Sequence, residues 1–128
     1  MATYLARPDG LPPVNGYSHV VAGSGTVVHV SGQVPARPDG SVVDPDDVEG
    51  QTEQVFTNLK AALAAVGATL ADVVKLTFYL TSIEDLPSVR TARDRYLDPE
   101  RLPATSLMQV AALVSPQFRV EIDAVAII

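Results

Sequence analysis

The sequence contains no cysteine, and this absence excludes several kinds of chemistry. Disulfide bonds, thiol nucleophiles and thiolate metal sites all require cysteine, so none of them occurs in this chain. The same absence leaves the redox state of the protein's compartment undecided, because disulfides are its usual marker.

Basic residues and long apolar runs are also scarce. The chain has 9 Lys and Arg against 15 Asp and Glu, giving a net charge of −6 and a pI near 4.6. A nucleic-acid partner requires clustered cations that displace counterions, so binding of nucleic acid is not expected. No segment reaches the roughly 18 consecutive apolar residues of a membrane-spanning helix, and the first residues show no apolar core followed by a cleavage site. We expect a cytoplasmic protein without a membrane partner.

Aromatic residues make up only 5% of the chain, yet its hydrophobic content is 47% and its mean hydropathy is +0.19. The apolar residues are therefore mostly Val, Ala and Leu. A chain of 128 residues supports one hydrophobic core, so we expect a single domain over residues 1–128. Because a small domain has much surface for its volume, the surplus of apolar residues indicates burial between subunits.

Turn residues and hydrophobic periodicity divide the chain into short elements. The expected elements, in chain order, are short strands at 4–5 and 17–22, a strand at 26–34, a helix from 44–47 to 67, a strand at 74–80, a helix from 82 to before 98, and two strands between 102 and 128. A hairpin turn is predicted at Gly23-Ser24-Gly25 between the second and third of these strands.

Both helices show an apolar face at helical spacing. In the first helix this face holds Val48, Val55, Phe56, Leu59, Leu63 and Val66, and Gly67 favours a left-handed stop. In the second it holds Ile83, Leu86, Val89, Ala92 and Tyr96. The segment Ser82-Ile83-Glu84-Asp85 resembles a capped helix start, with Asp in place of the usual Glu or Gln.

The last strand places three charges on one face. Its other face is apolar at period two and begins at Phe118. The charged face carries Arg119, Glu121 and Asp123, and then becomes apolar at Val125. Such a face is not typical of an ordinary solvated edge, so we interpret Glu121 as the chemical centre of the protein.

The order of elements predicts an α+β fold with a mixed sheet and both helices on one of its faces, because helical crossovers are right-handed. Two helices cover only one face. The opposite face includes several apolar side chains for which the monomer has no cover, among Tyr79, Met108, Val110, Val125 and Ile127. We therefore expect a closed homo-oligomer whose sheets turn their free faces inward.

Six short motifs, in this order and at these spacings, resemble the reactive intermediate deaminase family (RidA or YjgF type, often labelled L-PSP endoribonuclease). They are Gly16-Tyr17-Ser18, Ser31-Gly32-Gln33, the Asn58-Leu59 helix ending at Gly67, Asp72-Val73-Val74-Lys75, Leu102-Pro103-Ala104, and the segment from Val120 to Ala126. The resemblance covers nearly the whole chain. It implies a homotrimer of chorismate-mutase-like subunits with a small-molecule cleft at each interface, and hydrolysis of reactive enamines and imines without a cofactor.

The family resemblance also assigns site residues. Glu121 would orient the attacking water and move protons, as a carboxylate can do. Tyr17 would contribute a hydroxyl and a ring wall, and Ser31 with the Gly32 backbone would line the pocket floor. No metal site is expected, since His29 has only one further histidine as a partner.

One position departs from the family pattern. The family's enamine deaminases carry an arginine after Pro-Ala that binds the substrate carboxylate, whereas this chain has Thr105. A threonine donates one neutral hydrogen bond and does not neutralise a carboxylate, so weak or absent turnover of simple 2-imino acids is predicted. Arg90 or Arg93 on the second helix is a candidate for a relocated cation. The simpler interpretation is a solvated arginine paired with Asp94.

Simpler interpretations accompany the other candidates too. Glu121 alone would be a salt-bridged strand residue, Tyr17 an interface packing residue, and Ser31-Gly32 only strand-end geometry. For the whole protein, the alternative to a deaminase is a non-catalytic trimer that binds a small metabolite. A third hypothesis, RNA cleavage or translational inhibition, comes only from the family's label, and the acidic composition argues against it.

Overall fold

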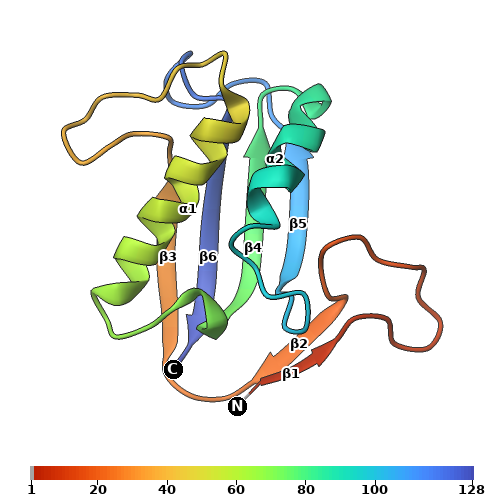
Figure 1. The fold of residues 1–128 in the computed structure, drawn as a ribbon. Coiled ribbons are helices and arrows are strands. Elements are labelled where there is room, and N and C mark those ends of the chain that lie inside the picture. Colours follow the sequence, from red (N-terminus) through yellow and green to blue (C-terminus); the bar gives the residue numbers. More distant parts are fainter. Residues whose placement is uncertain (1) are drawn as a thin grey trace.

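The computed structural model describes residues 2–128, which fold into two sheets and two α-helices (Figure 1). The elements are β1 Ala2–Leu5, β2 Val20–Gly23, β3 Val27–Gln33, α1 Val48–Ala64, η1 Leu70–Asp72, β4 Val73–Leu80, η2 Ile83–Asp85, α2 Leu86–Arg93, β5 Ala104–Gln109 and β6 Val120–Ile127. The main sheet has the strand order β3-β6-β4-β5, and β1 pairs with β2 in a separate ribbon.

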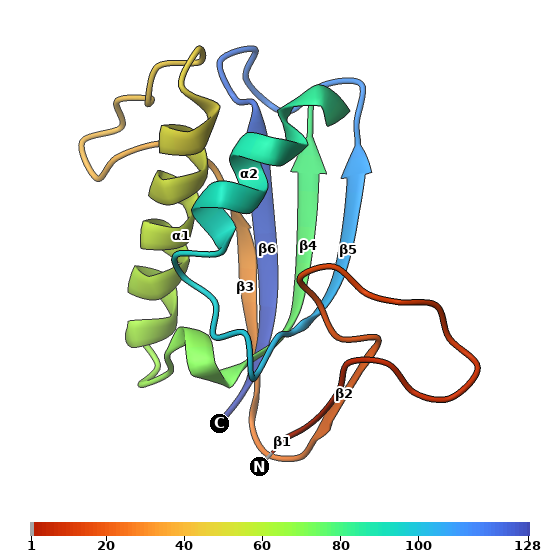
Figure 2. The ribbon, with the colours of Figure 1, turned by 45° about the vertical axis from the view of Figure 1, so that its right-hand side comes forward.

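The main sheet is mixed, and both helices cover the same face of it (Figure 2). Strand β6 runs antiparallel to both β3 and β4, whereas β5 runs parallel to β4. Helix α1 connects β3 to β4 over the intervening β6, and α2 connects β4 to β5. The predicted α+β architecture is therefore confirmed. None of the helices in residues 2–128 combines the length and apolar character needed to cross a bilayer.

Helix α1 begins and ends where its sequence predicts. The Asp47 side chain accepts a hydrogen bond from the Gly50 amide at 2.9 Å, which caps the first turn. At the other end Gly67 adopts φ +76°, and the Ala68 amide donates to the Leu63 carbonyl at 2.9 Å. The predicted apolar face is buried except for Val66, which is 51% exposed because it lies beyond the helical stretch.

The predicted hairpin at Gly23-Ser24-Gly25 is wrong. Strand β2 pairs with β1, and β3 pairs with β6, so the turn connects two different sheets. The amide of Thr26 instead donates to the carbonyl of Ile128 at 2.7 Å. This bond holds the start of β3 against the end of β6.

The predicted cap of the second helix is also wrong. Ser82 makes no side-chain capping hydrogen bond, and the Asp85 carboxylate accepts from Arg119 at 2.8 to 3.1 Å rather than from the Ser82 amide. Ile83, predicted to be buried, is 47% exposed because it lies on η2, before α2 begins. A capping box does occur in residues 2–128, but at Thr69–Asp72 before β4.

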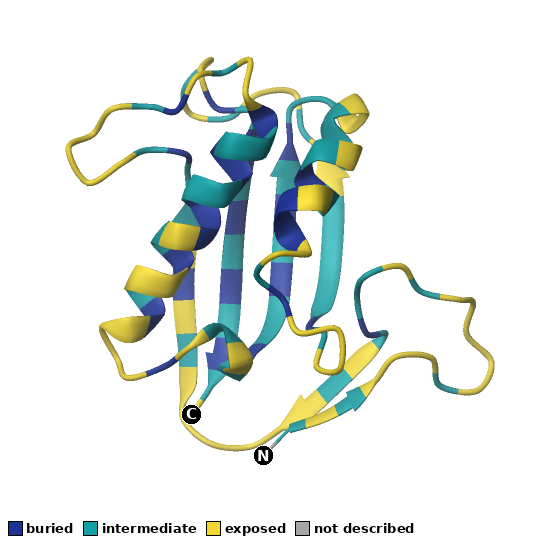
Figure 3. Cartoon of the chain, in the orientation of Figure 1, coloured by how far each residue is buried: buried dark blue, intermediate teal, exposed yellow. Residues whose placement is uncertain are grey.

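Strand β6 alternates along its whole length between the two faces of the sheet, and β4 does so from Leu76 onward, after a register shift between Val73 and Lys75 (Figure 3). Toward the helices the side chains are fully buried, for example Phe78 and Ile122. On the opposite face they are only partly covered. Glu121, Asp123 and Val125 lie on this face, which no helix or strand of residues 2–128 covers.

A buried glutamine holds the start of β6 in place. The Gln51 side chain donates to the carbonyls of Val43 at 2.9 Å and Gln117 at 2.8 Å, and accepts from the Arg119 amide at 2.8 Å. The Arg119 guanidinium donates to Pro45 as well as to Asp85. These bonds fix Gln117 and Arg119, which lie just before β6.

Candidate functional site

Glu121 lies directly against the backbone of Gly32. Its position in β6 faces the uncovered side of the sheet, and Gly32 belongs to the neighbouring strand β3 at the point where its register with β6 shifts. A Cβ atom placed on Gly32 would lie 2.8 Å from Cδ of Glu121, which is closer than carbon atoms pack. Glycine is therefore required there for the carboxyl group to rest on the strand. Ser31, the preceding residue, is exposed on the same face as His29.

The surroundings of Glu121 disfavour its charged form. Burial raises the pKa of Glu121 above its ordinary value, and the negative charge of Asp123 raises it further. Asp123 itself accepts a hydrogen bond of 2.8 Å from the Tyr79 hydroxyl. Arg119, which the sequence also places near Glu121, is bound to Asp85 instead. A carboxylate whose pKa is raised is a stronger proton acceptor, which suits the role of a general base.

Tyr17 lies at the other edge of the sheet, beside β5. Ser18 forms a parallel bridge with Ala104, and its amide donates to the Pro103 carbonyl at 3.1 Å. This pairing brings Tyr17 next to Thr105. The rings of His19 and Tyr17 are in edge-to-face contact, with their centroids 5.6 Å apart.

Tyr17 and Thr105 line one cavity together with two arginines. This cavity has a volume of about 300 Å³, and its polar lining consists of Asn15, Tyr17, Arg90, Arg93 and Thr105. Thr105 pairs with the buried Leu76, so it lies on the helix-covered face of β5. Its hydroxyl donates to the Pro103 carbonyl at 3.2 Å. Arg90 and Arg93, the two candidates for a relocated cation, thus line the same cavity as Thr105.

Arg93 is buried, contrary to the simpler interpretation of a solvated arginine. Its side chain is 8% exposed, although it does pair with Asp94 at 2.9 Å. A Cβ atom on Gly16 would lie 2.5 Å from Cζ of Arg93, so glycine is needed for the guanidinium to pack there. Sequence reasoning missed this burial and the part of Asn15 in the cavity. The motif Gly16-Tyr17 was the only hint of this contact in the sequence. It lies far from α2 along the chain, so no local pattern indicates that the two pack together.

The six predicted site residues thus form two separate groups. Ser31, Gly32 and Glu121 lie on β3 and β6, while Tyr17, Arg90 and Thr105 lie around β5. In the register of the sheet, Glu121 is level with Tyr79, whereas Thr105 is level with Leu76, three residues earlier in β4. That offset corresponds to roughly 10 Å along the strand, and the two side chains point to opposite faces. A single chain does not bring the two groups together.

Comparison with known proteins agrees with the family resemblance. The family model described as Endoribonuclease L-PSP matches residues 8–128. Protein DfrA of Myxococcus xanthus is 37% identical over 129 residues, covering 99% of this chain and 97% of that protein. A solved structure of a protein of unknown function from Yersinia pestis, YyfB of the conserved Rid protein family, superposes with a TM-score of 0.88 at 34% identity, covering 99% and 98% of the two chains. The chain belongs to the reactive intermediate deaminase (Rid) family.

One further relative carries an enzymatic name. The 2-iminobutanoate/2-iminopropanoate deaminase of Dermatophagoides farinae is 29% identical, covering 97% of this chain and 94% of that protein. Within residues 2–128 of the present Rid-family chain, no three His, Cys, Asp or Glu side chains are grouped so that they could hold a metal ion.

Proposed function

We propose that this Rid-family protein is a hydrolytic deaminase that converts small imines or enamines to carbonyl compounds and ammonia. The observation that carries the proposal is the carboxyl group of Glu121, part-buried against the Gly32 backbone with a raised pKa. The name of the Dermatophagoides farinae relative supports the same reaction class. The expected cytoplasmic location stays a prediction.

The reaction needs one residue that both accepts and donates a proton. The carboxylate of Glu121 takes a proton from water, whose oxygen attacks the imine carbon. The same carboxyl group then delivers this proton to the nitrogen, which gives a neutral carbinolamine. A second proton passes through the carboxylate from the hydroxyl group to the nitrogen, so that the C–N bond breaks with loss of ammonia and the oxygen is left as a carbonyl. An enamine first accepts a proton at carbon to become the imine. Tyr17 is assigned to orient the substrate through its hydroxyl.

The proposal includes a homotrimer, because each chain holds Glu121 and the Tyr17–Thr105 group on opposite faces of its sheet. The β5 edge of one subunit, with Tyr17 and Thr105, would meet the β3–β6 side of its neighbour, with Glu121. The uncovered sheet face supports such an assembly, since Val27 is 54% exposed there and Met108 is 39% exposed. Burial of this apolar face would also remove water from Glu121.

The substrate is proposed to differ from simple 2-imino acids. Thr105 is uncharged and its hydroxyl already donates to Pro103, so it leaves no donor for a carboxylate next to the imine carbon. Leaving such a carboxylate desolvated and unpaired costs about 2–5 kcal/mol. A substrate without this group, or with its negative charge elsewhere, fits the site better.

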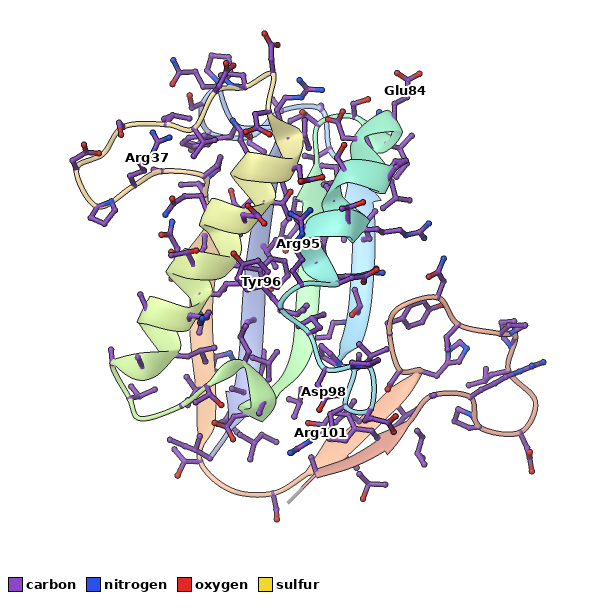
Figure 4. The ribbon with its side chains drawn as sticks, in the orientation of Figure 1. Arg37, Glu84, Arg95, Tyr96, Asp98 and Arg101 are labelled. Atoms are coloured by element: carbon purple, nitrogen blue, oxygen red, sulfur yellow. The ribbon has the colours of Figure 1, made fainter. Side chains whose placement is uncertain are left out.

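Ammonia release tests the reaction. Imines are generated in the assay from a panel of amines, and by an amino-acid oxidase from a panel of amino acids, and Glu121→Gln is compared with wild type. Glu84→Gln is the matched control, because Glu84 is exposed on η2 and its side chain points away from the sheet (Figure 4). We expect Glu121→Gln to lose at least a hundredfold in rate. Equal rates for wild type and Glu121→Gln on every substrate would exclude the proposed role.

A non-catalytic binding protein is the second candidate function, and the uncharged Thr105 favours it. The cavity of about 300 Å³ is at the lower end of the volumes that hold small ligands. Ligand binding by calorimetry without turnover of any imine would support this alternative. Turnover with ordinary saturation kinetics would rule it out.

A further inference from the structure

The cavity beside Thr105 carries a positive charge in an otherwise acidic protein. Two arginines, Arg90 and Arg93, line it together with neutral polar groups and two leucines, and its lining includes no carboxylate. The whole chain has a net charge of −6. Two cations beside a single neighbouring carboxylate, that of Asp94, leave a net positive charge that attracts anions.

Neither arginine is fully paired within residues 2–128. The Nε atom of Arg90 is buried and has no hydrogen-bond partner among the described residues. A buried donor without a partner is costly, so such a group calls for a ligand or an ordered water. Arg90 is also absent from the ion pairs formed within that part of the chain.

Arg93 is held in a fixed position and still has donors to offer. Its Nε and Nη2 atoms bind one oxygen of Asp94, which lines the adjacent cavity rather than this one. Its Nη1 atom takes part in none of the hydrogen bonds formed within residues 2–128. Contact with Gly16 on one side and burial on the other restrict the guanidinium to a single place. A fixed guanidinium loses little entropy when it binds a planar anion.

The two arginines and a leucine form one stripe along α2. Leu86, Arg90 and Arg93 follow each other at intervals of four and three residues, so they share one side of the helix and face the cavity. On the opposite wall, Thr105 and Leu107 are alternate residues of β5. The charged wall of the cavity is therefore the helix, and the strand provides only neutral groups.

We propose that Arg90 and Arg93 bind the carboxylate of a small organic acid in this cavity. The ligand's negative charge lies against α2, and its uncharged part extends along Thr105 and Tyr17. If the proposed deaminase function holds, the ligand is the imine substrate, and its carboxylate lies at a distance from the reacting carbon. This part of the proposal rests on the proposed function. The binding itself depends only on residues of one chain.

Calorimetry at low ionic strength tests the binding site with a series of straight-chain dicarboxylates, namely malonate, succinate, glutarate and adipate. Glutaramide serves as the neutral counterpart of glutarate. We expect at least one dicarboxylate to bind, the diamide not to bind, and Arg93→Gln and Arg90→Gln each to weaken binding by at least tenfold. Arg95→Gln is the control, because Arg95 lies on the α1 side of the helix end (Figure 4) and pairs with Glu49 and Glu53.

Folding of the variants is checked separately. Loss of the thermal unfolding transition would show that Arg93→Gln does not fold. In that case dicarboxylate binding is measured with Arg93→Lys and with Arg90→Gln, since Arg90 is less buried. Unchanged dicarboxylate affinity in the folded arginine variants would overturn the proposal. Failure of all four acids to bind wild-type protein in the millimolar range would overturn it as well.

A kinetic comparison separates this proposal from the deaminase function. We expect Arg93→Gln to lower kcat/KM at least tenfold more for imines with a distant carboxylate than for uncharged imines, whereas Glu121→Gln lowers kcat/KM for both to a similar extent. Arginine-dependent dicarboxylate binding without any turnover would refute the deaminase function and support the anion site. If both substrate types are turned over and their kcat/KM values are unchanged in Arg90→Gln and Arg93→Gln, the anion site is refuted but the deaminase function is not.

Discussion

Replacing Gly32 by alanine tests whether the position of the Glu121 carboxyl group matters. The added Cβ atom would lie 2.8 Å from Cδ and 3.1 Å from Cγ of Glu121. Carbon atoms in contact lie about 3.5–4.0 Å apart, so the carboxyl group must withdraw by roughly 1 Å. The side chain can do this by rotating, because its far side faces the uncovered part of the sheet. The backbone of Gly32 does not have a positive φ, so alanine fits its conformation.

The expected effect is a loss of activity without a comparable loss of stability. A misplacement of about 1 Å can cost about a hundredfold in rate, so we expect kcat/KM to fall by about 10- to 100-fold, or about 1.4–2.7 kcal/mol. The free energy of unfolding should change by less than about 1 kcal/mol, since alanine is at least as favourable as glycine in a strand. Ammonia release and denaturant unfolding measure the two quantities.

A double-mutant cycle provides the control. In the Glu121→Gln background the displaced group no longer acts as a base, so Gly32→Ala should cause little further loss. Wild-type kcat/KM in Gly32→Ala would refute the claim that the contact positions the catalytic group. A loss of the same size in both backgrounds would show that Gly32 acts independently of Glu121.

Three further substitutions address other parts of the structure. Gln51→Leu removes three bonds to backbone groups and is expected to lower the free energy of unfolding by about 2–4 kcal/mol in urea titrations; an unchanged midpoint would contradict this. Asp123→Asn removes a like charge and lowers the pKa of Glu121. If the ionised Glu121 is the base, activity rises with pH through this pKa, so the ascending limb of the kcat/KM profile should move to lower pH; a move to higher pH would contradict the assignment. Gly16→Ala should displace Arg93 and weaken dicarboxylate binding at least tenfold, and calorimetry with unchanged affinity would show that the contact is unimportant.

The alternating strands and the long helix could be predicted from the sequence because their signals are local. In β6, the period-two pattern identified which face Glu121 occupies. In α1, Asp47 and Gly67 stand at the two ends of an apolar stripe, so both ends were recognisable. The errors at Val66 and Ile83 arose where this periodicity continued beyond the ends of the helices.

Features that depend on distant partners could not be predicted. Asp85 has the spacing of a capping residue, but Arg119 competes for it from far along the chain and forms the stronger, charge-assisted bonds. In the same way, Arg93 looks like a solvated helix residue until the arm that contains Gly16 packs over it. In both cases tertiary contacts, rather than local preference, decide where the charged side chain goes.

The two groups of site residues differ in whether they need a second subunit. The proposed anion site and the proposed deaminase function can therefore be tested separately. The cavity with Arg90 and Arg93 is complete within one chain, because α2, β5 and the N-terminal arm form all of its lining. Glu121 instead faces an open sheet surface and would obtain a second wall only from another subunit. Binding of an organic acid should therefore survive dissociation of the proposed trimer, whereas catalysis should not. Tyr17 and Thr105 line the cavity with the two arginines, so the uncharged end of a bound acid would lie beside them. In the proposed trimer this end would also face Glu121 of the neighbouring subunit. The arginines of α2 would therefore bind the substrate, and Glu121 of β6 would carry out the proton transfers.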